Sequence, residues 1–199
     1  MTTALLIALL GFAFISTVTP GPNNLMLLAS GANFGFRRTI PHMLGITGGM
    51  ALMALLVGLG VMALFEAVPA LAGMLKILSA AYLLWLAAKI ATAAPPEARS
   101  AGGRPMTLIA AAAFQWVNPK AWAICLSGMT LYAPERTLVS VAAVAAAFAL
   151  VGLPAISVWA WLGTLLRQWL SDRTRLRSFN VAMALLLVAS LYPVLGLGG

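Results

Sequence analysis

Apolar residues form long runs along this chain, separated by short polar or turn-forming stretches. A helix needs about 20 mainly apolar residues to cross a bilayer, because each residue adds about 1.5 Å. The pattern therefore predicts an all-α integral membrane protein with six transmembrane helices. We expect these spans at Ala4–Asn33, Ile40–Leu64, Ala70–Ala93, Met106–Tyr132, Leu138–Leu166 and Phe179–Leu197.

The connections between these runs are short or rich in turn residues. FEAVP (65–69) and APERT (133–137) predict tight hairpins, and the Pro-, Gly- and charge-rich stretch 92–105 predicts a cytoplasmic linker. We therefore divide a single membrane domain, 1–199, into repeat one (1–95), the linker (92–105) and repeat two (106–199).

Composition supports the bilayer as the solvent of this chain. Hydrophobic residues make up 62% of it, charged residues only 8%, and the mean hydropathy is +1.00, whereas soluble domains carry about 25% charged residues. The net charge of +8 comes without a nucleic-acid-binding motif, so we expect lipid as a partner and no nucleic acid. Nothing in the sequence calls for a cofactor, and the single cysteine, Cys125, allows no internal disulfide.

Basic residues concentrate in alternate loops, which predicts the orientation. The loops after the first, third and fifth spans hold nearly all of them, whereas Arg136 is the one found in the other loops and termini. Because Lys and Arg favour the cytoplasmic side, we expect a multi-pass protein of the bacterial cytoplasmic (inner) membrane with both termini extracytoplasmic. The basic loop residues are Arg37, Arg38, Lys89, Arg99, Arg104, Arg167, Arg173, Arg175 and Arg177.

Two of the predicted spans contain turn-forming motifs. VTPGPNN interrupts the first at Val18–Asn24, and QWVNPKAW interrupts the fourth at 115–122. Pro20 and Pro119 are about half a chain apart, so each half holds three helices, and an odd number makes the halves insert in opposite orientations. Such inverted repeats are typical of secondary transporters, whose sites lie near the midplane at paired broken helices.

Both motifs fall inside the membrane by residue count, about 18 Å into the fourth span at Asn118 and about 24 Å into the first at Pro20. Proline removes a backbone donor, and unpaired backbone groups cannot face lipid. The breaks therefore face protein or a wet cavity, although a plain proline kink is the simpler alternative. The candidate substrate-binding residues are Pro20, Gly21, Pro22, Asn23, Asn24, Gln115, Asn118, Pro119 and Lys120.

Lys120 is the most informative of these residues, because an ionisable group deep in a membrane helix is costly unless it has a function. It could bind a substrate carboxylate, or it could bind carbonyls freed by Pro119 or extend to the interface. His42 could carry a coupling proton or be structural. Gly45 and Gly49 form a GxxxG motif, which supports close helix packing within one chain or in a homodimer.

The residues also limit the class of function. An intramembrane enzyme or a metal exporter would need buried carboxylates, several histidines or thiolates, and the predicted spans lack such sets, so we expect no catalytic residues and no metal site. A passive channel and a non-transporting membrane scaffold remain open, because paired helix breaks can also line a pore.

Several motifs together resemble the LysE/RhtB family of bacterial amino-acid exporters. They are TPGPNN, the Ser30–Arg38 stretch, Leu75–Leu83 and VNPKAW, and the likeness covers essentially the whole chain. SGANFGFR, LLWLAAKIAT and FNVAMALLLV resemble the branch that exports cysteine and O-acetylserine, whereas Ser79 and Ala87 replace the usual glycines. The resemblance implies export of small amino acids or derivatives, driven by the proton gradient.

Overall fold

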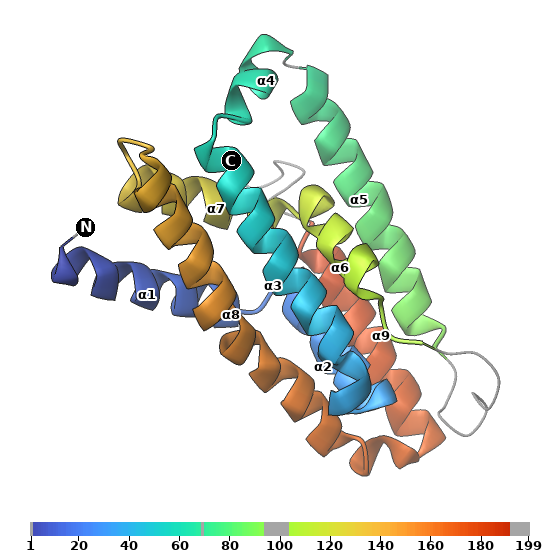
Figure 1. Cartoon of the computed structure of the whole chain (residues 1–199). Coiled ribbons are helices and arrows are strands. Elements are labelled where there is room, and N and C mark those ends of the chain that lie inside the picture. Colours follow the sequence, from blue (N-terminus) through green and yellow to red (C-terminus); the bar gives the residue numbers. More distant parts are fainter. Residues whose placement is uncertain (1, 69, 94–103, 192–199) are drawn as a thin grey trace.

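The structure is a computed structural model that describes residues 2–68, 70–93 and 104–191. These residues form helices and connecting turns, with no strand among them (Figure 1). The helices are α1 (Thr3–Val18), α2 (Pro22–Phe34), α3 (Phe36–Gly58), α4 (Met62–Ala67), α5 (Ala70–Ala91), α6 (Leu108–Phe114), η2 (Gln115–Val117), α7 (Pro119–Tyr132), α8 (Leu138–Leu166), η3 (Trp169–Ser171) and α9 (Arg173–Ala189).

Three helical stretches are long and apolar enough to cross a membrane: α3, Gly73–Ala91 within α5, and α8. The α1 and α2 helices together are also long and apolar enough to form a fourth span. This span is broken, because the chain bends by 59° between the two helices. The prediction of an all-helical membrane protein is confirmed. Six spans arranged as inverted repeats stay a prediction, since Leu108–Val117 is shorter and the expected sixth span continues beyond the described residues.

The predicted helix boundaries were right in some places and wrong in others. α8 matches the expected fifth span, and 133–137 connects α7 to α8 as a turn. The expected loop at Arg37 and Arg38 was wrong, because both lie in the first turn of α3. Gly35 alone joins α2 to α3 with φ 82° and ψ 164°, a conformation essentially limited to glycine. The predicted 65–69 hairpin begins inside α4, and the predicted linker lies mostly outside the described residues.

The helices pack through small residues at several crossings. A Cβ on Gly31 would lie 2.1 Å from the Ala160 carbonyl oxygen, so α2 and α8 are in backbone contact there. A Cβ on Gly45 would lie 2.3 Å from the Leu108 oxygen, and one on Gly49 would meet Ala112 at 2.7 Å. The GxxxG motif of α3 therefore packs against α6 of the same chain, and a homodimer remains a prediction.

One end of the helix bundle carries most of the positive charge. The start of α3, the ends of α5 and α8 and the start of α9 all lie toward the lower end of Figure 1. Every described Lys and Arg belongs to this end except Lys76, Lys120 and Arg136. The charge asymmetry read from the sequence is thus also an asymmetry of the folded bundle. The basic residues at this end are Arg37, Arg38, Lys89, Arg104, Arg167, Arg173, Arg175 and Arg177.

Candidate functional site

The first helix interruption exposes the carbonyl end of α1, and side chains from elsewhere bind it. The Asn24 Nδ2 donates to the carbonyls of Thr17 at 2.8 Å, Val18 at 3.3 Å and Thr19 at 2.7 Å. The Trp159 Nε1 of α8 donates to the Val18 carbonyl at 2.9 Å. Backbone groups that lose helical partners must find others away from water, and these bonds satisfy that need.

The second interruption separates α6 from α7. The chain tightens into the 3₁₀ turn η2, and Asn118 then adopts an extended conformation with φ −98° and ψ 106°. Its side-chain oxygen accepts a hydrogen bond from the Lys120 backbone N–H at 3.2 Å, and Pro119 is the first residue of α7. Asn118 is therefore an N-cap, and proline occupies the position where its missing N–H costs nothing.

Lys120 joins the two interruptions. Its Nζ donates to the carbonyl oxygens of Thr19 at 2.6 Å and Pro20 at 3.1 Å. Of the alternatives left by the sequence, carbonyl binding is what the structure shows, but the carbonyls belong to the α1 end rather than to the break at Pro119. A cation at the C-terminal end of a helix is also favoured by the helix dipole.

A pair of amides also joins the two interruptions. The Asn23 Nδ2 donates to Gln115 Oε1 at 2.8 Å, and the Gln115 Nε2 donates back to Asn23 Oδ1 at 3.1 Å. Gln115 is fully buried and also donates to the Ala111 carbonyl at 2.9 Å. Buried polar groups that are fully paired hold their segments in one arrangement, so this amide pair fixes α2 against the α6 end.

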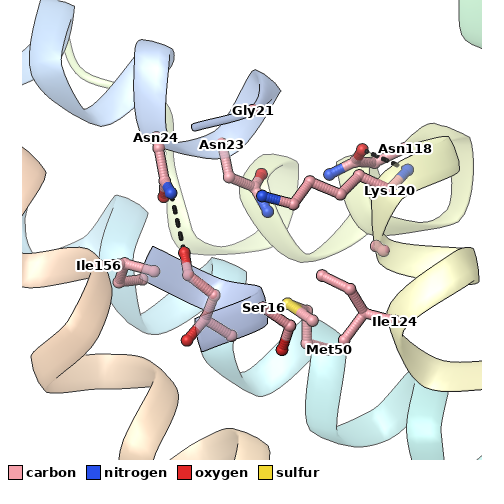
Figure 2. A pocket seen from close by; sticks show the side chains of 11 residues that line it. Ser16, Gly21, Asn23, Asn24, Met50, Asn118, Lys120, Ile124 and Ile156 are labelled. Atoms are coloured by element: carbon pink, nitrogen blue, oxygen red, sulfur yellow. Dashed lines mark hydrogen bonds between the residues drawn. The ribbon is translucent and has the colours of Figure 1, made fainter. Parts of the chain in front are cut away.

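A small cavity lies between the two interruptions (Figure 2). Its volume of about 20 Å³ is room for about one water molecule, far below the 300–1,000 Å³ or so of ordinary ligand sites. The Lys120 side chain reaches across it toward Gly21 and Asn23. The break cavity, as we call it, is lined by Ser16, Thr17, Gly21, Asn23, Asn24, Met50, Asn118, Lys120, Ala121, Ile124 and Ile156.

The break cavity offers both signs of polarity. No side chain caps the N-terminus of α2 in the described part of the chain, so the positive end of that helix dipole faces the cavity. The Asn24 Oδ1 is buried and has no partner among the described residues. Lys120 adds a formal positive charge. A zwitterion could thus place its carboxylate near Lys120 and the α2 N-terminus, and its ammonium near Asn24 and the α1 carbonyls.

The structure brings all the sequence-predicted site residues to this region. Five of them line the break cavity, and Gln115 is hydrogen-bonded to one of these, Asn23. Pro20 accepts a hydrogen bond from Lys120 through its carbonyl. Pro22 is the first residue of α2, and Pro119 is the first residue of α7. Sequence reasoning missed Trp159, which caps α1 from α8. It also missed the α1, α3 and α8 residues of the lining, because membrane helices carry no local signal for which face meets a cavity. The five lining residues are Gly21, Asn23, Asn24, Asn118 and Lys120.

Gly21 leaves room for the Lys120 side chain, which gives a first prediction. A Cβ on Gly21 would lie 2.7 Å from the Lys120 Cδ and 3.1 Å from its Nζ. Because the far end of a lysine can move, we expect Gly21→Ala to fold and insert normally while displacing the ammonium. The export that the family resemblance implies should fall about tenfold in vesicles, the loss of one charge-assisted hydrogen bond. Gly11→Ala, which meets nothing within 4 Å, is the control; equal rates in both variants would contradict the expectation.

The fold and the site define the class of this protein. The broken apolar span α1–α2 and the shorter apolar segment α6–η2, followed by α7, carry interruptions that meet at a polar cavity, an arrangement found in membrane transporters. Within the described residues, no group of three or more His, Cys, Asp or Glu side chains could hold a metal ion.

Comparison with known proteins places the chain in a family. The model of the LysE type translocator family matches residues 7–190. Relatives named cysteine/O-acetylserine efflux protein, from Escherichia coli (strain K12) and Shigella sonnei (strain Ss046), are each 34% identical over 193 residues, covering 94% of this chain and 96% of theirs. No solved structure matches. The chain belongs to the LysE family, and it is a multi-pass transporter of the bacterial inner membrane rather than an enzyme.

Proposed function

We propose that this protein is a secondary transporter that exports small amino acids or derivatives, such as cysteine and O-acetylserine, from the cytoplasm. The proton gradient drives the export, and the substrate binds at the two helix breaks. One observation carries the proposal: Lys120 of the α7 break is hydrogen-bonded to the Thr19 and Pro20 carbonyls of the α1–α2 break. The names of the relatives support the substrate class.

The bonds of Lys120 suggest how a zwitterion is bound. In this structure the lysine ammonium donates hydrogen bonds to the carbonyl oxygens at the end of α1. An arriving substrate ammonium takes over these carbonyls together with the Asn24 oxygen, and Lys120 turns to the substrate carboxylate. The N–H groups at the start of α2 bind the other carboxylate oxygen. The exchange keeps each charged group paired, as the low-dielectric surroundings require.

We infer from the small volume of the break cavity that this structure is a closed state. A site with room for about one water admits an amino acid only after the helices around it separate. The exchange at Lys120 supplies a reason for them to do so, because it releases the two hydrogen bonds from Lys120 of α7 to the Thr19 and Pro20 carbonyls. A permanently open channel would need a continuous wide path instead.

Helix packing supports the proposed inverted repeat. The long helix of each half packs against the first part of the other half's broken helix: α8 against α1, and α3 against α6. The division into 1–95 and 106–199 pairs these elements. The basic end of the bundle then lies in the cytoplasm, and both termini lie outside.

We propose that the proton carrier is not a carboxylate of the break cavity, since no Asp or Glu is among the lining residues in the described part of the chain. Glu135 and Asp172 lie exposed in connections between helices. We propose that protons are exchanged through the substrate or through a residue outside the break cavity.

Inverted membrane vesicles test the function, because their cytoplasmic face is outside and export becomes uptake. We expect O-acetylserine to accumulate above the external concentration when the vesicle interior is acidified, and an uncoupler to abolish the accumulation. Vesicles without the protein are the control. Equilibration without accumulation would contradict the transporter in favour of a passive channel, and no flux of any candidate amino acid would favour a scaffold.

A further inference from the structure

A second and much larger cavity lies beyond the break cavity, along α2. Its volume is about 580 Å³, within the 300–1,000 Å³ or so that is typical of sites for small molecules. Residues of α2, α3, α5 and α6 line it, together with the residues just before α6. The lining of this cavity, here called the basic cavity, includes Met26, Ser30, Asn33, His42, Lys89 and Arg104.

The charge of the basic cavity has one sign. Lys89 and Arg104 line it, and none of the lining residues that the structure describes is Asp or Glu. The Lys89 ammonium lies 4.4 Å from the centre of the Trp85 ring, so a cation–π contact holds it at the wall. Both cations belong to the basic end of the bundle. A wide cavity with fixed positive charge attracts carboxylates and raises their local concentration.

His42 gives a second, independent reason to expect a ligand there. The side chain is only 2% exposed, and neither of its ring nitrogens has a hydrogen-bond partner among the described residues. Buried polar groups are almost always paired, and an unpaired one calls for an explanation. A neutral imidazole offers one donor and one acceptor. Both nitrogens are buried in this structure, so the ring must turn toward the basic cavity for a polar ligand there to pair with it.

The position of the basic cavity relative to the break cavity suggests the order of use. α2 lines both cavities: Asn23 and Asn24 face the smaller one, and Met26 and Ser30, about one and two turns further along than Asn23, face the larger one. Asn23 of the break cavity is paired with Gln115, which follows α6, and α6 lines the basic cavity through Ala110. Phe114 stacks on Tyr82 with ring centres 5.3 Å apart.

We propose that the basic cavity is a second substrate site, which receives the amino acid from the cytoplasmic end before it passes to the break cavity. Lys89 and Arg104 bind the carboxylate, and His42 binds a polar group of the same molecule. On the proposed path the amino acid passes the Asn23–Gln115 pair, which contains a lining residue of the break cavity, and the Phe114–Tyr82 stack, which contains a lining residue of the basic cavity. The inference rests on the proposed export function and adds a loading step to it.

The test measures initial uptake of cysteine against concentration in inverted vesicles. For the double variant Lys89→Gln with Arg104→Gln, we expect KM to rise about tenfold, the loss of a charge-assisted contact, with a maximal rate within about twofold of wild type. Lys76→Gln is the matched control, since Lys76 is an exposed lysine of the same helix outside the basic cavity. Its KM should equal that of the wild type.

A second pair of variants tests His42 separately from folding. His42→Leu removes both polar nitrogens and should raise KM, whereas His42→Gln keeps a donor and an acceptor and should have a KM close to that of the wild type.

Competition by cysteamine, which lacks the carboxylate, tests the two cations of the basic cavity. It should be weak in the wild type and stronger relative to cysteine in the double variant.

The outcomes distinguish the inference from the function on which it rests. Suppose that the wild-type protein transports and that the double variant and His42→Leu both have its KM. This result would overturn the second site and leave the export function standing. Wild-type vesicles that never accumulate substrate would overturn both.

Discussion

Replacing Lys120 by methionine is expected to lower amino-acid export about 100-fold, because a charge-assisted contact to the substrate carboxylate is worth up to about 3 kcal/mol. Methionine keeps most of the apolar stem and removes only the ammonium. In the proposed mechanism the substrate carboxylate then has no cation to meet it, and the α1 carbonyls lose their link to α7. The measurement is the initial rate of O-acetylserine uptake into inverted vesicles.

Two controls separate this functional effect from a loss of fold. The Thr19 carbonyl keeps its bond from Asn24, so we expect Lys120→Met to be inserted at wild-type amounts and to elute as a single species from size-exclusion chromatography. Lys76→Met removes an exposed lysine and should transport at the wild-type rate. Wild-type flux from the Lys120 variant would remove Lys120 from the site.

Gly163→Ala is expected to destabilise the protein by about 3 kcal/mol, at the upper end of the usual cost of overpacking. A Cβ at this position would lie 2.1 Å from the Leu28 carbonyl oxygen and 2.8 Å from the Ala32 nitrogen. Both are backbone atoms, so no side chain can rotate away, and α8 must move from α2. Because α2 carries Asn23 and Asn24, the break cavity should be lost together with the stability.

Gly152→Ala is the matched control on the same helix. Its Cβ would meet only the methyl groups of Thr17 and Thr47, each at 3.7 Å, which is ordinary contact. We expect this variant to keep the wild-type midpoint of thermal unfolding in detergent, measured by tryptophan fluorescence, and Gly163→Ala to unfold at a much lower temperature. Similar midpoints for both variants would show that the α2–α8 crossing is looser than the structure places it.

Much of this protein could be predicted from its sequence. Long apolar runs determine an all-helical membrane fold, since only helices and closed barrels satisfy the backbone within lipid. The prolines of TPGPNN and NPK determine where the helices must break, because proline cannot donate to the preceding turn. The depth and charge of Lys120 mark it as a functional candidate. The motifs also identified the LysE family, which the comparisons confirmed.

Other features were decided only by the tertiary structure. The sequence offered carbonyls freed by Pro119 as only one of several alternatives for Lys120, whereas the structure shows bonds to carbonyls at the α1 end, about a hundred residues away. It allowed the GxxxG motif of α3 to serve a dimer, whereas the motif packs against α6. It also gave no sign that Trp159 caps α1 or that His42 lines a large cavity.

The physical reason is the same in each of these cases. In a bilayer, both the lipid-facing and the protein-facing sides of a helix are apolar, so hydrophobic periodicity does not show which face meets a neighbour. Local sequence therefore determined the helices and their breaks. Which carbonyl accepts from which side chain, and where a cavity remains, depends on how helices distant in sequence cross, and only the folded arrangement decides it.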